Sequence, residues 1–96
     1  MREGKTKVPV LILGERHTTI LLVAMLEANR RVKLSELYQY LKFKSLNPLT
    51  DRMAQEGLIT KKIDRETYVI TFLELTPKGR AIAEKLKEAF DILQED

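Results

Sequence analysis

The chain has 96 residues, of which 44% are hydrophobic and 32% are charged. This length suits one domain with one modest core, and the composition excludes a disordered or fibrous protein. The sequence contains no Cys and only one His, so it cannot build a disulfide, a zinc site or a nucleophilic triad within one chain.

Positive charge is concentrated in the middle of the chain, although the net charge is only +3. Between Arg30 and Arg65 there are nine basic and four acidic side chains, whereas the segment from Thr76 to Asp96 has four basic and five acidic ones. Such a cluster is typical of proteins that bind a polyanion. The absence of Cys fits a reducing compartment, so we expect a cytoplasmic protein. No apolar run reaches the roughly 18 residues that cross a bilayer, so we expect no membrane contact.

The first elements in chain order are an arm and a helix. Residues 1–17 form a polar, basic arm that includes the apolar run 8–13, which is compatible with a strand or with a helical turn docked on a partner subunit. Apolar residues then recur at helical spacing up to Ala28. They predict a first core helix that begins at Thr18 or Thr19, either of which is a suitable N-cap.

A second helix is predicted after a short extended link. Ser35 is a suitable N-cap, and Glu36 is favourably placed in the first turn. Leu37 and Leu41 then lie on the inner side of the helix, and Phe43 closes it against the core. The segment is therefore expected to be the second helix of a small helical core.

A third helix has the strongest boundary signals. Asn47 is a favourable N-cap, and Pro48 is suited to the first helical position because its missing amide has no partner there. Gly57 is suited to the left-handed position that follows a last helical turn. Leu49 and Met53 then face the core, which leaves a polar outer surface.

A hairpin and a long helix complete the chain. Residues 58–63 and 67–75 predict two strands joined by an exposed tip, and Thr76-Pro77 repeats the helix-start chemistry. The last helix, of roughly 27 Å, is longer than so small a domain needs. Its apolar stripe predicts a homodimer interface: Ile82, Leu86, Ala89, Phe90 and Leu93.

This order of elements is that of an α+β winged helix-turn-helix domain, with a three-helix core, a two-stranded β wing and a long C-terminal helix. The segments LSELYQYL, QEGLI and LTPKGRAIAEKL resemble archaeal and bacterial transcriptional regulators of the MarR-like and PadR-like kind. The resemblance implies that the third helix enters the DNA major groove, that the wing lies along the backbone or minor groove, and that flanking helices form the dimer. Pro48 and Thr50 depart from the usual pattern of these regulators.

Candidate DNA contacts follow from this resemblance and from the charge. A helix N-terminus attracts phosphate, and Asn47 and Gln55 have the groups for paired hydrogen bonds to adenine. Asp51 opposes DNA binding unless it accepts from a cytosine amine or pairs with Arg52 or Lys44. On the hairpin, a solubilising role of lysines on an edge strand is nearly as plausible as phosphate contact. The candidate contacts are Lys44, Ser45, Asn47, Thr50, Arg52, Lys61, Lys62, Arg65, Arg30 and Arg31.

The expected organisation is an N-terminal arm (1–17), a winged-helix DNA-binding domain (18–75) and a dimerisation helix (76–96). The expected function is that of a homodimeric regulator of transcription that binds double-stranded DNA through a recognition helix at about 47–56 and a basic wing at about 58–75, with no cofactor, metal or enzymatic activity. Two alternatives are a winged-helix module that contacts another protein and an architectural protein that binds DNA without sequence preference. No sequence pattern identifies a small-molecule effector.

Overall fold

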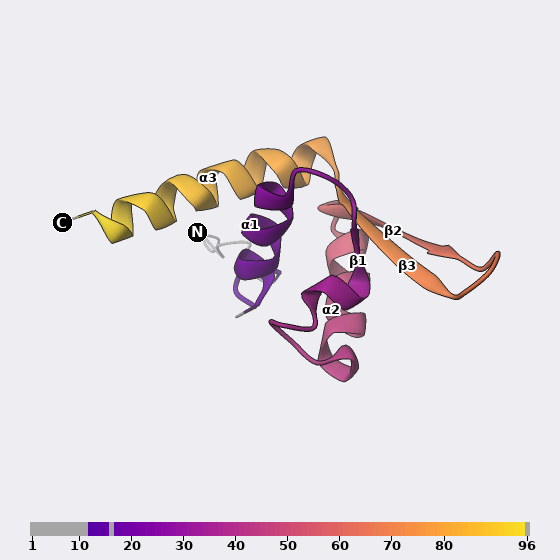
Figure 1. Cartoon of the computed structure of the whole chain (residues 1–96). Helices are drawn as coiled ribbons and strands as arrows, with labels where there is room; N and C mark the ends of the chain where they lie inside the picture. Colours follow the sequence, from indigo (N-terminus) through magenta and orange to yellow (C-terminus); the bar gives the residue numbers. More distant parts are fainter. Residues whose placement is uncertain (1–11, 16, 96) are drawn as a thin grey trace, which may run out of the picture.

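The part of the chain that the structure describes, residues 12–15 and 17–95, contains both helices and antiparallel strands. In this computed structural model the strands join into one sheet, from which a hairpin projects (Figure 1). Most of the predicted arm and of the apolar run 8–13 lies outside the described residues. The elements are α1 (Thr18–Ala28), β1 (Val32–Lys33), the 3-10 helix η1 (Leu34–Leu37), α2 (Phe43–Gln55), β2 (Ile59–Asp64), β3 (Ile70–Leu75) and α3 (Pro77–Gln94).

The helix α1 spans the predicted residues, but its N-cap is His17, so neither Thr18 nor Thr19 caps it, and it ends through Asn29. This residue adopts the left-handed conformation (φ 53°), which Asn tolerates better than most residues. Its amide donates to the carbonyl oxygens of Met25 and Leu26, both at 3.1 Å. The chain therefore leaves the helix in a tight turn and passes directly into β1.

The strand β3 is the centre of the sheet, whose order is β1-β3-β2. The strands β2 and β3 form the predicted hairpin and pair over six residues each. Val32, which we expected in an extended link, pairs with Leu73, so β1 adds a third strand. Because β1 has only two residues, the outer part of the hairpin stands free of it as a wing (Figure 1).

The second predicted helix is wrong in its length and type. The 3-10 helix η1 ends at Leu37, and a turn replaces the helix that we expected to reach Phe43. The amides of Tyr38 and Tyr40 donate to carbonyl oxygens three residues earlier, at 3.1 and 3.0 Å, which is the 3-10 spacing. Leu37 is buried and Leu41 packs against the core, so the inward positions were predicted correctly.

The third predicted helix, α2, starts earlier than expected. Its N-cap is Lys42 and its first residue is Phe43, so the Asn47-Pro48 pair lies inside the helix. Phe43 is 52% exposed and closes no earlier helix against the core. Pro48 leaves one main-chain hydrogen bond of α2 unmade. The complete burial of Leu46 offsets part of this cost, because burying a Leu side chain stabilises by about 1.5–3 kcal/mol.

The end of α2 is where the sequence predicted it. Gly57 has a φ of +79°, and its amide donates to the carbonyl oxygen of Ala54 at 3.0 Å. The amide of Leu58 donates to the carbonyl oxygen of Met53 at 3.0 Å, and both of these side chains are buried. This pair of bonds is a Schellman motif, which satisfies the last carbonyl groups of the helix.

The start of α3 is hydrogen-bonded to the residues that follow the C-terminal end of α2. Thr76 caps α3 by accepting a hydrogen bond from the amide of Gly79 (2.9 Å), and its hydroxyl lies 3.1 Å from the carbonyl oxygen of Leu58. A Cβ on Gly79 would overlap that same carbonyl oxygen, so only glycine fits. Lys78 donates to the carbonyl oxygen of Glu56 at 3.1 Å. We call these contacts the α2–α3 clamp.

The helix α3 covers α1 and then continues beyond it. Leu21 and Leu22 of α1 and Ala83 of α3 are fully buried. Further along, Lys87 lies 3.7 Å from Glu27 of α1. As predicted, α3 is long: it has 18 residues, and its C-terminal part extends from the body on the side opposite the wing (Figure 1).

Candidate nucleic-acid interface

The helix α2 presents a polar stripe to the surface. The period of the helix places one residue of each turn on the side away from the core, and all of these residues are exposed: Lys44, Pro48, Asp51 and Gln55. The opposite side carries the buried residues Leu46, Leu49, Thr50 and Met53. The helix is therefore fixed by one face and free to contact a partner with the other.

The N-terminus of α2 lies about one turn earlier than predicted. Lys44 and Ser45, two of the candidate contacts, are exposed in the first turn, where the positive end of the helix dipole attracts phosphate. Lys42, which the sequence reasoning did not select, is the exposed N-cap residue beside them. The helical spacing of Leu46, Leu49 and Met53 was the signal that α2 begins before Asn47.

Thr50 is buried, contrary to its assignment as a DNA contact. Its side chain is 0% exposed, and its hydroxyl lies 3.0 Å from the carbonyl oxygens of both Leu46 and Asn47. Threonine is usually exposed, and a hydroxyl is tolerated in a core only when it is hydrogen-bonded, as this one is. A base or phosphate therefore does not reach Thr50.

Lys61 points toward α2 rather than toward solvent, and its side chain is only 10% exposed. Its ammonium group lies within hydrogen-bond distance of four oxygen atoms of α2. These are the carbonyl oxygen (3.1 Å) and Oδ1 (2.7 Å) of Asn47, Oγ1 of Thr50 (2.9 Å) and Oδ1 of Asp51 (2.8 Å). We call this arrangement the Lys61 cage. Asp51 thus pairs with a cation of the wing, and not with either of the α2 cations that the sequence suggested.

Two other candidate cations have partners on the surface. Arg52 lies 3.1 Å from Oε2 of Glu15, with both side chains about half exposed. The guanidinium carbon of Arg31 lies 4.0 Å from the ring centre of Phe72, a cation–π contact. Exposed ion pairs contribute less than about 1 kcal/mol, so a phosphate can replace Glu15 as the partner of Arg52 at little cost.

Arg30 forms a bidentate ion pair with Glu36. Its two terminal nitrogens contact the two carboxylate oxygens of Glu36 at 3.2 and 2.7 Å. Glu36 also accepts the amide of Lys33 at 2.9 Å, and Lys33, not Ser35, is the N-cap of η1. The hydrogen bond from Arg30, followed by that from the Lys33 amide, lowers the pKa of Glu36 to about 2, and the same carboxylate raises the pKa of Arg30.

The remaining candidates on the wing are exposed. Lys62 lies beside Lys61 in β2, so its side chain points to the opposite face of the sheet, where it stands across from Phe72. Arg65 lies at the wing tip, where Oδ1 of Asp64 accepts the amide of residue 66 at 3.0 Å. The structure therefore places these two cations on separate parts of the wing.

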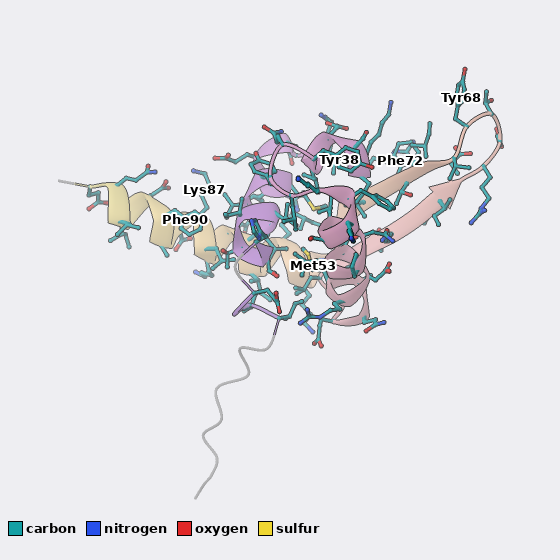
Figure 2. All side chains as sticks on the ribbon, turned by 90° about the horizontal axis from the view of Figure 1, so that it is seen from below. Tyr38, Met53, Tyr68, Phe72, Lys87 and Phe90 are labelled. Carbon is teal, nitrogen blue, oxygen red and sulfur yellow. The ribbon has the colours of Figure 1, made fainter. Side chains whose placement is uncertain are left out.

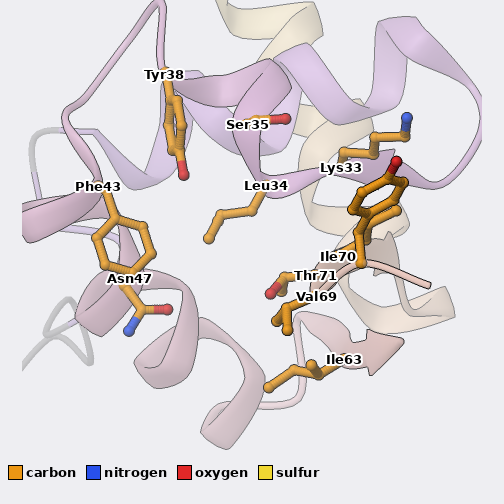
Figure 3. A pocket seen from close by; sticks show the side chains of 11 residues that line it. Lys33, Leu34, Ser35, Tyr38, Phe43, Asn47, Ile63, Val69, Ile70 and Thr71 are labelled. Carbon is orange, nitrogen blue, oxygen red and sulfur yellow. The ribbon is translucent and has the colours of Figure 1, made fainter. Parts of the chain in front are cut away.

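A groove of about 540 Å³ separates the wing from η1 and the first turns of α2 (Figure 3). The rings of Tyr38 and Phe43 meet edge to face there, with their centres 6.4 Å apart. Tyr68, at the outer end of the wing (Figure 2), and its neighbour Val69 are 74% and 72% exposed. The apolar side chains that line this groove are Leu34, Tyr38, Phe43, Ile63, Tyr68, Val69 and Ile70.

The apolar residues selected on α3 divide into two groups. Ile82 and Leu86 pack against the core of their own chain. Ala89, Phe90 and Leu93 follow on the C-terminal part of α3, where Phe90 is seen in Figure 2, and Leu93 is 82% exposed. Only the second group lies clear of the core as a candidate interface.

The described helices include none that combines the length and the apolar character needed to cross a membrane. In residues 12–15 and 17–95, moreover, no three His, Asp or Glu side chains come together in a way that would hold a metal ion.

No protein-family model and no curated protein sequence matches the chain. Several solved structures, in contrast, have a similar fold. AF1382 from Archaeoglobus fulgidus superposes with a TM-score of 0.75 at 14% identity, over 91% of this chain and 98% of that one. A transcriptional regulator homologue from Pyrococcus horikoshii OT3 gives a TM-score of 0.65 at 20% identity, over 88% and 89% of the two chains. A mutant of E. coli MarR in complex with operator DNA gives 0.61 at 18% identity, over 79% of this chain and 56% of MarR.

These likenesses confirm the predicted fold. The chain has the α+β winged helix-turn-helix fold of MarR and PadR-like transcriptional regulators. Two features of the sequence that suggested it, QEGLI and LTPKG, meet in the α2–α3 clamp. Gly57 ends α2 in the left-handed conformation, and Gly79 is the position at which the clamp leaves no room for a side chain.

Proposed function

We propose that the chain is a transcriptional regulator that binds double-stranded DNA through α2 and the wing. The observation that carries this proposal is the exposed polar stripe of α2, which begins with Lys44 at the positive end of the helix and lies next to a wing with further cations. A structure with the same fold was solved on operator DNA. Lys44 and the helix amides would contact phosphate, while Gln55 would read a base edge.

The proposed DNA contacts differ from those that the sequence suggested. Lys44, Ser45 and Arg52 remain on α2, with Lys42 and Gln55 added, and Lys62 and Arg65 remain on the wing. Arg30 and Arg31 stay as secondary phosphate contacts, because each already has a partner within the chain. Asn47 is retained, Thr50 is removed because it is buried, and Lys61 is removed because its ammonium group is held by α2.

We also propose that two copies form a dimer through the C-terminal part of α3, so that residues 76–96 serve dimerisation. This proposal is supported by the exposure of Ile92 (66%) and Leu93 (82%), which are large apolar side chains near the end of α3. A dimer would present two copies of α2 to successive turns of one duplex.

The test is a binding titration on duplex DNA at several salt concentrations. The wild type should bind, and the logarithm of its affinity should fall linearly with the logarithm of the salt concentration because counterions are released. Reversing the charges at Lys44, Lys62 and Arg65 to Glu should abolish binding. Lys85→Glu, at an 81% exposed side chain of α3, is the control and should retain most of the affinity. Absence of wild-type affinity even at low ionic strength would refute the proposal.

One observation favours a second candidate, a module that contacts another protein. Tyr68 and Val69 expose apolar surface at the wing beside the groove of Figure 3. A protein contact centred there should survive the charge reversals, whereas Tyr68→Ser should weaken it. Competition between a selected duplex and random duplex separates a specific regulator from an architectural DNA-binding protein.

A further inference from the structure

Lys61 links the wing to α2, and this role differs from the phosphate contact expected from its charge. In the described residues, each side-chain hydrogen bond between α2 and the two strands of the wing uses the Lys61 ammonium group. The side chain is 90% buried, and Asp51 supplies the countercharge at 2.8 Å. Removing one partner of such a pair is costly, because it leaves the other charge without compensation.

The cage also has no capacity left for a phosphate. An ammonium group has three protons, and here it has four oxygen neighbours within 3.1 Å. A phosphate contact would require Lys61 to abandon at least one of these oxygens and to leave a partly buried site. The neighbouring Lys62 is exposed and bears no such constraint.

The cage fixes the orientation of the Asn47 side chain as well. An ammonium group can only donate, so the Asn47 atom 2.7 Å from it is the amide oxygen. The amide nitrogen, with its two hydrogens, therefore points away from Lys61. The paired contact with adenine that the sequence suggested needs both a donor and an acceptor, but the Asn47 oxygen faces Lys61, which engages one of its two lone pairs.

We propose that Lys61 is a positioning residue, which locks the wing to α2 and restricts Asn47 to donating hydrogen bonds. Asn47 would then favour a base edge rich in acceptors, such as O6 and N7 of guanine, over the mixed edge of adenine. This inference rests on the proposed binding of duplex DNA. It assigns the adenine-type contact to Gln55, whose exposed amide has no partner among the described residues.

The experiment compares a variant that removes the ion pair without changing the net charge with one that removes a single exposed cation. Lys61→Met with Asp51→Asn breaks the cage, whereas Lys44→Met removes one phosphate contact from the surface of α2. We expect the double variant to bind more weakly by a similar factor, on the order of tenfold, at every salt concentration. We expect Lys44→Met instead to reduce the slope of the salt dependence by about 0.9.

Two further measurements separately test the effect of the cage on base preference and its effect on the mobility of the wing. Sites selected by the double variant from random duplex should gain adenine at a position where the wild type selects guanine, since Oδ1 of Asn47 is released. In the protein without DNA, NMR order parameters of the wing amides should fall in the double variant while those of α2 remain high.

Wild-type affinity or unchanged base preference in the folded double variant would overturn the inference. A slope that falls by about 0.9 in Lys61→Met alone but is unchanged in Asp51→Asn would identify Lys61 as a phosphate contact instead. If the wild type itself fails to bind duplex DNA, the proposed function fails. The order parameters still test the lock between the wing and α2 in that event, and unchanged values would refute it.

Discussion

At the scale of single residues, the sequence identified where cations lie but not what they contact. Lys61 and Lys62 have the same charge and adjacent positions, yet one is nearly buried and the other exposed. The pleat of a strand guarantees that they point to opposite faces, but only the position of α2 decides which face is covered. Thr50 was misassigned because the predicted helix began at Asn47. Since α2 begins at Phe43, the carbonyl oxygens of Leu46 and Asn47 lie one turn before Thr50 and accept from its hydroxyl, which permits its burial.

Glu36 should make the stability of the protein depend on pH in the acid range. Its pKa is about 2 in the folded chain and 4.5 when unperturbed. Its contribution is therefore fully present above pH 4.5 and is lost as the pH falls toward 2. Glu36→Gln should have a lower Tm than the wild type near neutral pH, and this difference should shrink as the pH falls through that range.

Thermal unfolding followed by circular dichroism measures this effect. Glu84→Gln is the matched control because Glu84 is exposed on α3, and it should shift the Tm little at any pH. A difference between Glu36→Gln and the wild type that stays constant across the acid range would contradict the assignment of the ion pair with Arg30.

At the scale of elements, the ends of helices were predicted where they depend on local hydrogen bonds. Gly57 and Thr76 were assigned correctly because a left-handed glycine and a capping hydroxyl act within one turn. The start of α2 was wrong because Asn47-Pro48 is a strong local signal that tertiary packing overrides. Leu46 is 0% exposed, and its burial holds the first turn of α2 in place.

Gly79→Ala should disrupt the α2–α3 clamp. The added methyl group would overlap the main-chain carbonyl of Leu58, which cannot move without disturbing both helices. We expect a loss of stability of about 2–3 kcal/mol, measured by urea unfolding. Gly57→Ala is the comparison, because its Cβ has no close neighbour but its φ of +79° is unfavourable, at a cost of about 1–2 kcal/mol. A smaller effect at Gly79 than at Gly57 would show that the clamp tolerates a side chain.

At the scale of the whole molecule, the wing and the C-terminal part of α3 project on opposite sides of the core (Figure 1). The sequence predicted a hairpin and a long last helix, because the alternation of strand residues and the length of a helical pattern can be recognised without tertiary information. It did not separate the apolar residues of α3 that serve their own core, Ile82 and Leu86, from those that do not. That division depends on where α1 ends beside α3.

Leu93→Asp should convert the proposed dimer into a monomer. Leu93 is 82% exposed, so a charge there should leave the folded monomer intact while opposing burial between two copies. Sedimentation velocity measures the change. Gln94→Asp introduces the same charge one residue away from the apolar stripe and should leave the dimer unchanged. A wild type that already sediments as a monomer would refute the proposed interface, whereas Leu86→Asp is unsuitable as a test because it would damage the core.

The α2–α3 clamp also bears on the entropy that the chain loses when loops close during folding. Its bond between Thr76 and Leu58 closes a loop of 18 residues, whereas the pairing of Val32 with Leu73 closes one more than twice as long. Loop closure costs about 0.6 kcal/mol more for each doubling in length. The residues that the clamp joins lie on either side of the hairpin. Closing this one loop therefore also brings β2 and β3 together, without a further loop-closure cost. The strand β1 then meets a hairpin whose two ends are already joined.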